Sequence, residues 1–306
     1  MKILVTGAEG FVGGYIRNEL LSHGHEVICG SFDERDGYIQ LDILDQKQIE
    51  ELLNKYRPDA IINMAGQADV GLSWRIPQKT IQLNTIGPVN ILEAVRKIDP
   101  AIKVVFAGSS DEYGFLGKNG TNVTEDFELK PITPYAISKV MQEKMALIYH
   151  KNFCMNVCMA RCFTLSGPGQ AKGFVITDFA SGVAEIENGL KKELLVGNLE
   201  SARDFTHVKD AAKAYRLIAE KGHSGEIYNI CNGVTSSLKE VLEKLTGMSD
   251  AQITVKQDPS RMRPSDTPVI CGNHDKLTAH TGWRPEYSID DILFDTLDYW
   301  RKHTKA

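Results

Sequence analysis

Short apolar runs alternate with longer amphipathic stretches along the first half of the chain. Apolar runs of the length of buried strands lie at residues 3–5, 27–28, 60–63, 104–107 and 157–160. Helix-like stretches separate them at residues 12–22, 46–55, 90–97 and 138–150. Strands that alternate with helices predict an α/β fold with a doubly wound parallel sheet.

The pattern changes after Gly167-Pro168-Gly169, where Gly and Pro residues punctuate short apolar runs. Two further helix-like stretches follow, at residues 236–245 and 290–301. This half predicts a smaller, mixed α/β lobe. No low-complexity tract separates it from the first half, so we expect the two to share an interface whose cleft binds the ligand.

The composition is that of a globular protein, with 306 residues of which 42% are hydrophobic and a net charge of -5. Because no dense basic block is present, nucleic acid is not expected as a partner. The first strand begins directly after Met1, and no stretch reaches membrane-spanning length. We therefore expect a cytoplasmic protein without a signal peptide or a membrane anchor.

Six cysteines are scattered along the chain, and three of them, Cys154, Cys158 and Cys162, lie four residues apart. This spacing lacks the Cys-x-x-Cys and Cys/His pairs of zinc sites. The cysteines are expected to be free core thiols, and no metal site is predicted.

A glycine-rich turn follows the first strand and opens the first helix, with the sequence Gly-Ala-Glu-Gly-Phe-Val-Gly at residues 7–13. In this context glycines let a backbone approach a pyrophosphate at the helix N-terminus, as in Rossmann-type dinucleotide sites. The candidate cofactor-binding residues in the turn are Gly7, Gly10, Phe11, Val12 and Gly13. About 20 residues further on, Asp33 is the candidate for binding the ribose hydroxyls, which slightly favours NAD over NADP.

The candidate catalytic groups are Ser109, at a strand end, and the pair Tyr135 and Lys139. Residues four apart share one face of a helix. A lysine cation about 4 Å from a tyrosine hydroxyl would lower its pKa by up to roughly three units at an effective dielectric of 20. The serine would polarise a carbonyl while the tyrosine transfers the proton.

The chain resembles the extended short-chain dehydrogenase/reductase family along its whole length. The resemblance rests on these motifs and on Asn84-Thr85-x-Gly87, Ser-Ser-Asp-Glu-Tyr-Gly at 109–114 and Arg161-x-Phe163. Within this family, the later part of the chain resembles the branch of GDP-mannose 4,6-dehydratases and GDP-4-keto-6-deoxy-mannose reductases. The segments that carry this resemblance are 167–170, 196–200, 203–206, 263–266 and 281–285. The resemblance implies NAD(P)H as cofactor, a nucleotide-sugar substrate that is GDP-linked, and a homodimer.

The resemblance also implies further site residues. Asp42 and Ile43 are the expected adenine contacts, and Met64, Ala65 and Gly66 form the turn under the cofactor, with Gly66 where the family has a second alanine. The expected substrate contacts are Thr164, Val175, Arg203, Arg263 and Asp266.

The expected domains follow from the pattern and the resemblance together. The NAD(P)-binding Rossmann domain is predicted to comprise residues 1–165 with parts of 204–232 and 264–276. The substrate-binding lobe is predicted to comprise residues 166–203, 233–263 and 277–306.

The reaction within the branch depends on Ser110 and Asp111, which follow Ser109. The resemblance implies that dehydratases carry a glutamate at position 111, where it removes a sugar proton. Asp111 is one methylene shorter, and a misplacement of about 1 Å costs on the order of a hundredfold in rate. Glu112 should point to the other side of the chain. We therefore predict reduction of a 4-keto group, with 4,6-dehydration as the alternative.

Other functions remain open. Thr164-Leu165 stands where the branch has Asn-His, so the sugar or the base can differ and a sugar-nucleotide 4-epimerase is an alternative. A non-catalytic NAD(P)-binding regulatory subunit is a third, although it would not need the intact set of Ser109, Tyr135 and Lys139.

Overall fold

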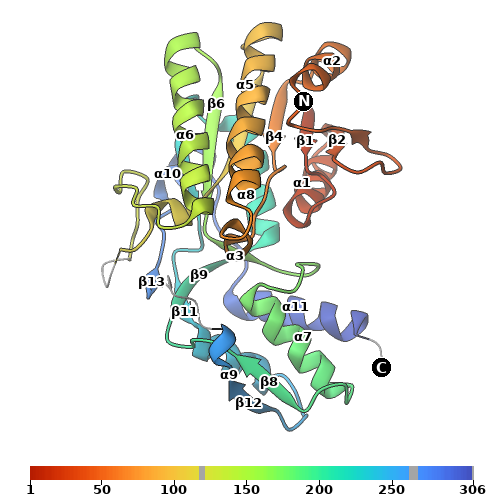
Figure 1. The fold of residues 1–306 in the computed structure, drawn as a ribbon, viewed down its shortest axis with the longest axis vertical. Coiled ribbons are helices and arrows are strands. Elements are labelled where there is room, and N and C mark those ends of the chain that lie inside the picture. The colour runs from red at the N-terminus through yellow and green to blue at the C-terminus, as the bar shows by residue number, and fades with distance from the viewer. Residues whose placement is uncertain (117–120, 262–267, 305–306) are drawn as a thin grey trace.

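The computed structural model describes residues 1–116, 121–261 and 268–304. Its larger part is built around one parallel seven-stranded sheet, in the order β10-β6-β5-β4-β1-β2-β3 (Figure 1). The strands are β1 (Lys2–Thr6), β2 (Glu26–Ser31), β3 (Ile39–Gln40), β4 (Ala60–Asn63), β5 (Lys103–Ser109), β6 (Val157–Cys162) and β10 (Ile227–Ile230). The predicted α/β doubly wound fold is therefore confirmed.

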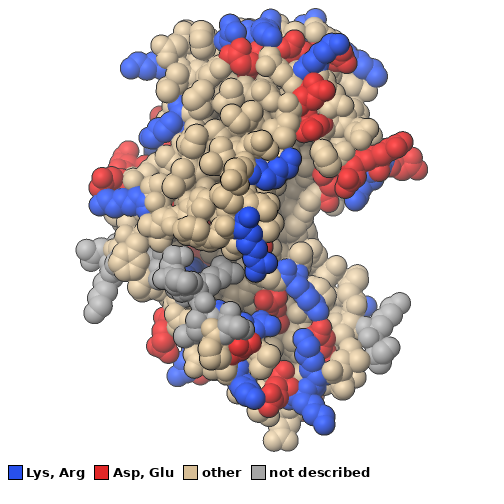
Figure 2. Space-filling model, in the orientation of Figure 1, with Lys and Arg blue, Asp and Glu red and all other residues tan. Residues whose placement is uncertain are grey.

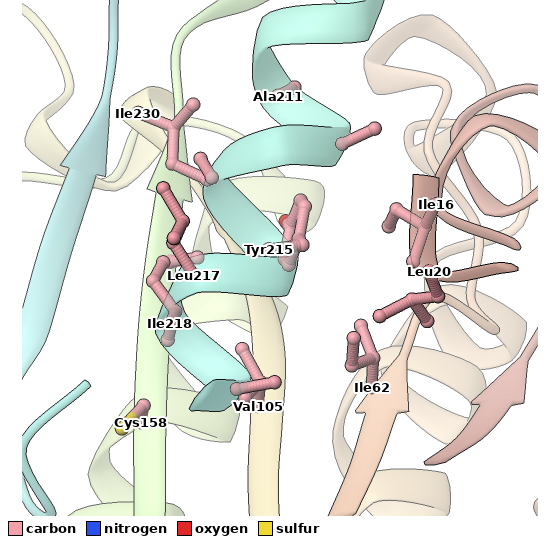
Figure 3. Packing of buried hydrophobic residues seen from close by; sticks show 14 of the residues in the cluster. Ile16, Leu20, Ile62, Val105, Cys158, Ala211, Tyr215, Leu217, Ile218 and Ile230 are labelled. Carbon is pink, nitrogen blue, oxygen red and sulfur yellow. The ribbon is translucent and has the colours of Figure 1, made fainter. Parts of the chain in front are cut away.

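Helices cover both faces of this sheet, because alternate strand residues point to opposite sides. Ile3 and Val5 belong to the core beneath α1 (Phe11–Ser22) and α8 (Val208–Lys221), whereas Leu4 belongs to the core beneath α2 (Gln46–Tyr56), α5 (Gly87–Ile98) and α6 (Pro134–Phe153). Figure 3 shows Ile16 and Leu20 pointing from α1 toward α8. The short helix α10 (Asp275–Thr281) joins the first of these two cores through Leu277.

The five strands predicted from apolar runs are present, and the helix boundaries differ by a few residues for identifiable reasons. Helix α6 begins earlier than predicted, at Pro134, because the Thr133 side chain caps it by accepting the Ala136 amide. Helix α9 (Leu238–Gly247) begins later, because Ser237 ends strand β11 (Thr235–Ser237) and caps the helix. Strand β10 has no counterpart among the predicted runs.

A smaller lobe is formed mainly by the later part of the chain and has its own core, which includes Phe179, Leu194, Val241 and Ile292. Its helices are α7 (Val175–Glu187), α9 and α11 (Ile289–His303). One sheet has the order β11-β9-β13, with β7 also pairing with β9, and a second sheet pairs β12 with β8. These strands are β7 (Thr164–Ser166), β8 (Glu193–Val196), β9 (Ala202–His207), β12 (Thr254–Gln257) and β13 (Val269–Ile270).

Two buried residues, Trp283 and His207, hydrogen-bond the first turn of α8. Trp283 is completely buried, and its indole N–H donates to the Asp210 carbonyl at the start of α8. His207 is the N-cap of α8 and accepts the Lys209 amide. Both therefore have structural roles, at the point where the chain passes between the two parts.

The surface carries charged side chains of both signs (Figure 2). Figure 2 shows Lys and Arg interspersed with Asp and Glu on the face in view. Across the described ranges, no helix could cross a membrane and no group of three His, Cys, Asp or Glu side chains could hold a metal ion. All six cysteines are free thiols.

Candidate active site

A cleft of about 800 Å³ lies between the carboxyl ends of the parallel strands and the smaller lobe. Its floor comes from the residues that follow β1, β4 and β5, because the carboxyl ends of parallel strands meet at one edge of a sheet. The opposite wall comes from β7, α7 and β9. The cleft is the expected position of a ligand in this topology.

The glycine turn forms one end of the cleft, and all five of its predicted residues line it. Gly7 has a φ of 64°, and a Cβ there would lie 2.8 Å from the Ala65 nitrogen. A Cβ at Gly13 would lie 2.1 Å from the Gly7 oxygen. Gly10 caps α1 without a side-chain hydrogen bond, so the first amides of this 12-residue helix can face an anion. This arrangement fits the pyrophosphate of a dinucleotide.

The turn after β4 is the second part of the dinucleotide region. Met64 and Gly66 line the cleft, whereas Ala65 lies behind it and donates its amide to the Thr6 hydroxyl at 3.2 Å. A Cβ at position 66 would lie 2.8 Å from the Asn84 side-chain oxygen, which explains why glycine replaces alanine there. Asn84 belongs to the π-helical turn η1 (Gln82–Ile86), a feature that is common at functional sites.

Besides Ala65, three predicted cofactor contacts have side chains outside the lining of the cleft. Asp33 is exposed beyond the end of β2. The Asp42 carboxylate accepts the Leu44 amide at 2.9 Å. Ile43 is buried in the core, where a Cβ at Gly87 would lie 2.4 Å from its Cδ1. The structure therefore brings the glycine turn to the cleft but not these three side chains.

Ser109, Tyr135 and Lys139 meet in the middle of the cleft. Ser109 ends β5, and the other two lie on successive turns at the start of α6. All three line the cleft although each side chain is buried. Tyr135 hydrogen-bonds the Ser109 side chain, and the Lys139 ammonium donates to the Ala107 carbonyl at 2.8 Å. The three groups that sequence analysis selected are thus brought together.

Their electrostatics differ from the prediction. Burial raises the pKa of Tyr135 above its usual range, and the Asp111 carboxylate raises it further. Burial lowers the pKa of Lys139 to about 8, although the Glu112 carboxylate acts in the opposite direction. The predicted net lowering of the Tyr135 pKa is not found for the chain alone, because desolvation by burial dominates. The Lys139 nitrogen lies 5.9 Å from the Tyr135 ring centre and donates to the Ala107 carbonyl.

Asp111 and Glu112 follow Ser109 in the 3₁₀ turn η2 (Ser110–Tyr113). The Ser109 hydroxyl accepts the Asp111 amide at 3.1 Å, and both Ser110 and Asp111 line the cleft. Glu112 points into the core, as predicted, but the helical turn and not strand alternation causes this separation.

The opposite wall contains three of the predicted substrate contacts. Thr164 in β7, Val175 at the start of α7 and Arg203 in β9 all line the cleft. Arg263 and Asp266 lie outside the described residues.

Gln67 and Arg261 are among the polar residues of the cleft that sequence analysis missed. Gln67 lines it with a side-chain oxygen that is buried and accepts no hydrogen bond in the described part of the chain. Arg261 lines it from the 3₁₀ turn η4 (Pro259–Arg261) and lies 3.8 Å from Asp178. The position of Gln67 at a strand end could have indicated it, whereas no local pattern marks Arg261.

The sheet, the glycine turn and the Ser109, Tyr135 and Lys139 cluster define an extended short-chain dehydrogenase/reductase. Within that class, the chain belongs to the GDP-mannose 4,6-dehydratase family, whose sequence model matches residues 4–296. It is 31% identical over 305 residues to the GDP-6-deoxy-D-mannose reductase of Pseudomonas aeruginosa, covering 99% of this chain and 98% of that protein. It is 24% identical over 342 residues to a Vibrio cholerae GDP-mannose 4,6-dehydratase, and the match covers 95% of this chain and 91% of that protein.

Solved structures show the same relationship. RMD from Pseudomonas aeruginosa, complexed with NADPH, superposes with a TM-score of 0.90 at 30% identity and covers 99% of both chains. UDP-glucose 4-epimerase from Thermus thermophilus, in complex with NAD, gives a TM-score of 0.88 at 28% identity and covers 99% of this chain and all of its own.

Proposed function

We propose that this protein is an NAD(P)H-dependent oxidoreductase that reduces the 4-keto group of a GDP-linked 6-deoxy sugar. The observation that carries the proposal is one cleft that joins the glycine turn to Ser109, Tyr135 and Lys139. The full-length similarity to a GDP-6-deoxy-D-mannose reductase supports the substrate class. The NADPH and NAD complexes of related structures support the cofactor.

The glycine turn would hold the cofactor, with Gly7, Gly10 and Gly13 admitting its pyrophosphate to the first amides of α1. When bound, the nicotinamide supplies a hydride. Met64 and Gly66 would support the cofactor from below, and the Gln67 side-chain oxygen beside them accepts no hydrogen bond from the described residues. Asp33, Asp42, Ile43 and Ala65 remain candidates only for contacts outside the cleft lining.

The reaction roles follow from the hydrogen bonds. Tyr135 would donate its phenolic proton to the carbonyl oxygen of the sugar, because its raised pKa keeps the phenol protonated before the reaction. Ser109, which hydrogen-bonds Tyr135, would donate to the same oxygen and stabilise its developing charge. Lys139 as a cation would favour the negative charge left on Tyr135 after the transfer.

The opposite wall would bind the nucleotide sugar. Arg203 is the candidate for its diphosphate, because a forked guanidinium matches phosphate oxygens. Thr164 would offer a hydroxyl and Val175 an apolar contact to the sugar. Arg263 and Asp266 stay candidates on the sequence alone.

Dehydration of GDP-mannose is the second candidate, because the family and a Vibrio cholerae relative bear that name. Asp111 lines the cleft beside Ser109, where a carboxylate could accept a sugar proton. Its side chain is one methylene shorter than glutamate, which disfavours the transfer.

We also propose the predicted domain division and a homodimer. Separate hydrophobic cores for the large sheet and the smaller lobe support the division in outline, but Leu277 and Trp283, assigned to the lobe, pack in the core of the large sheet. The apolar side chains of Ile137, Met141 and Ile148 are exposed along one face of α6, where a second copy would cover them. Light scattering of the purified protein tests the dimer.

The deciding experiment offers NADPH or NADH with GDP-4-keto-6-deoxy-mannose, and in parallel with GDP-mannose alone. Oxidation of the cofactor with the keto sugar only is the expected result. A 4-keto product from GDP-mannose supplied with NADP+ or NAD+, without another enzyme, would instead establish the dehydratase, whose overall reaction leaves the cofactor unchanged. If the keto sugar causes no cofactor oxidation and GDP-mannose gives no 4-keto product, both candidates are removed.

A further inference from the structure

Beneath the catalytic cluster lies a group of buried charges to which the proposed reaction assigns no role. Glu112 and Glu143 are completely buried, and Arg161 is 2% exposed. They come from three elements, η2, α6 and β6, that pack together behind the cleft. Buried charges are costly unless they are paired, so the pairing within this group is informative.

Arg161 makes four hydrogen bonds in the described part of the chain, and none of them is to Glu112. Two of its nitrogens bind the Glu143 carboxylate in a fork, each at 2.8 Å. Its third nitrogen donates to the Tyr113 hydroxyl and to the Glu125 carbonyl, both at 2.9 Å. One buried cation is thereby matched to one buried anion, and Glu112 is left as a second carboxylate.

Glu112 connects instead to the catalytic cluster. One of its oxygens accepts the backbone amide of Ser109 at 2.7 Å. The other is buried 3.8 Å from the Arg161 Nε and accepts no hydrogen bond within the described ranges. The remaining buried cation nearby is Lys139, which interacts electrostatically with Glu112 and whose nitrogen donates to the Ala107 carbonyl.

We propose that Glu112 is a positioning residue for the reaction: it fixes Ser109 through its backbone amide and supplies the counter-charge that keeps Lys139 cationic. The inference rests on the proposed function in one respect, because it takes the Lys139 cation to be needed for turnover. Glu112 itself touches neither the cleft nor the reacting atoms, since the cleft is lined by Ser110 and Asp111 on the same turn.

The charges around the pair define the expected effect. Burial, and then Glu143, raise the pKa of Glu112, while Arg161, the Ser109 amide and Lys139 lower it, so Glu112 acts as a counter-charge to Lys139 only at a pH where its carboxyl is ionised. Burial lowers the pKa of Lys139 to about 8, and Glu112 and then the Cys162 thiol raise it. The ionisable groups that face the pair or its partners are Arg161, Cys162, Glu143, Tyr135, Asp111 and Tyr113. Neutralising Glu112 should therefore lower the pKa of Lys139 further, so that its charge is lost at lower pH.

The test is a titration of Lys139 by NMR of the full chain labelled at the lysine Cε, with Lys139→Met to assign its signal. In Glu112→Gln the amide oxygen can still accept the Ser109 N–H, but the charge is gone. We expect the midpoint of Lys139 to fall by about one pH unit, because a nearby opposite charge favours the charged form of a buried lysine. The alkaline limb of kcat should move to lower pH by the same amount.

Glu125→Gln is the matched control. Glu125 is also a buried carboxylate of this region, and its side chain accepts the Asn229 amide at 2.8 Å, but it is not among the charges that act on Lys139. Its removal should leave the Lys139 midpoint unchanged. A midpoint unchanged in Glu112→Gln, or shifted equally in Glu125→Gln, would overturn the proposal.

A reciprocal measurement does not depend on the folding of Glu112→Gln. Coupling between two titrating groups is mutual, so Lys139→Met should raise the pKa of the Glu112 carboxyl by a matching amount. Carboxyl NMR of the glutamate-labelled protein measures this, and an unchanged Glu112 titration contradicts the inference. Because neither titration needs substrate, a wild-type chain that fails to reduce the keto sugar would refute the proposed function and leave this result standing.

Discussion

The two walls of the cleft are built in different ways. The wall on the large sheet consists of strand ends and the helix starts that follow them, so its chemistry depends on backbone positions such as Gly7 and Gly10 and on side chains fixed in the core. The opposite wall gathers Thr164, Val175 and Arg203 from three elements. In the first, the topology of a parallel sheet brings the groups together. In the second, the packing of a separate lobe does so.

The comparison implies that the sheet wall carries the chemical step and the opposite wall carries substrate affinity. Variants on the first should lower kcat or cofactor affinity, and variants on the second should raise KM. A variant of the sheet wall that only raises KM, or a variant of the opposite wall that only lowers kcat, would contradict this division of roles.

The largest effect is expected for Tyr135→Phe, which removes the proposed proton donor from the sheet wall. Turnover should fall by about 10²–10⁴-fold with little change in cofactor affinity. Tyr15→Phe is the control, because the Tyr15 hydroxyl donates only to the Pro168 carbonyl at 3.0 Å, outside the main cleft. Steady-state kinetics measure both variants. Near-normal turnover in Tyr135→Phe would show that proton transfer uses another group.

Gly10→Ala and Gly14→Ala compare two glycines at the start of α1. Gly10 lines the cleft, where a methyl group would block the approach of a pyrophosphate. At Gly14 a Cβ would lie 3.9 Å from its nearest neighbour, the Ala8 oxygen, and the residue is outside the cleft lining.

Gly10→Ala should weaken the binding of NADH and NADPH together by roughly tenfold or more, given about 1.4 kcal/mol for each factor of ten. Gly14→Ala should leave binding unchanged and stabilise the helix by up to about 1 kcal/mol. Fluorescence titration measures binding. Equal losses in both variants would mean that helix packing, not access to the turn, controls affinity.

Arg203→Met tests the opposite wall. Loss of a charged hydrogen bond worth about 1.5–3 kcal/mol should raise the KM for the sugar nucleotide by roughly tenfold or more. The cofactor affinity should not change. Arg301→Met is the control, because Arg301 forms a surface pair with Glu187 and should affect only stability, by about 0–1 kcal/mol. A normal KM in Arg203→Met would move the diphosphate site elsewhere.

The difference between the walls also explains what the sequence could predict. The strand at 60–63, the glycine turn and the meeting of Ser109 with Tyr135 follow from local motifs at strand ends. Strand β10 is a four-residue strand whose pairing with β6 joins distant parts of the chain, so no local pattern marks it. Arg261 reaches the cleft only through the folding of the smaller lobe.

Electrostatics were less predictable than positions. Spacing places Tyr135 and Lys139 on one helix face, but it does not determine how far the surrounding core desolvates them. Their pKa values move mainly through burial, which depends on the packing of α6 against β5 and η2. Glu112 is a similar case. It points into the core because residues 110–113 form a 3₁₀ turn, and the sequence of adjacent acidic residues does not predict that turn.

The smallest effects concern stability, and they come from two buried groups on β9, the strand beneath the opposite wall. Asp204 accepts three backbone amides, from Asn232, Gly233 and Gly272, yet burial raises its pKa to about 6. Burial, and then Lys209, lower the pKa of His207 to about 4.

The two groups should act on stability in opposite directions between about pH 4 and pH 6.5. A carboxyl whose pKa is raised on folding contributes stability at low pH that is lost as the pH rises through the folded value. A histidine whose pKa is lowered contributes stability at neutral pH that is lost as the pH falls toward 4. His207→Asn, which keeps a good N-cap for α8, should therefore reduce the loss of melting temperature on acidification by a few degrees. Asp204→Asn should increase that loss by a similar amount, whatever its effect at neutral pH. Melting curves of the three proteins from pH 4 to pH 7 measure the slopes, and slopes that change in the same direction would show that other groups control the acid sensitivity of this wall.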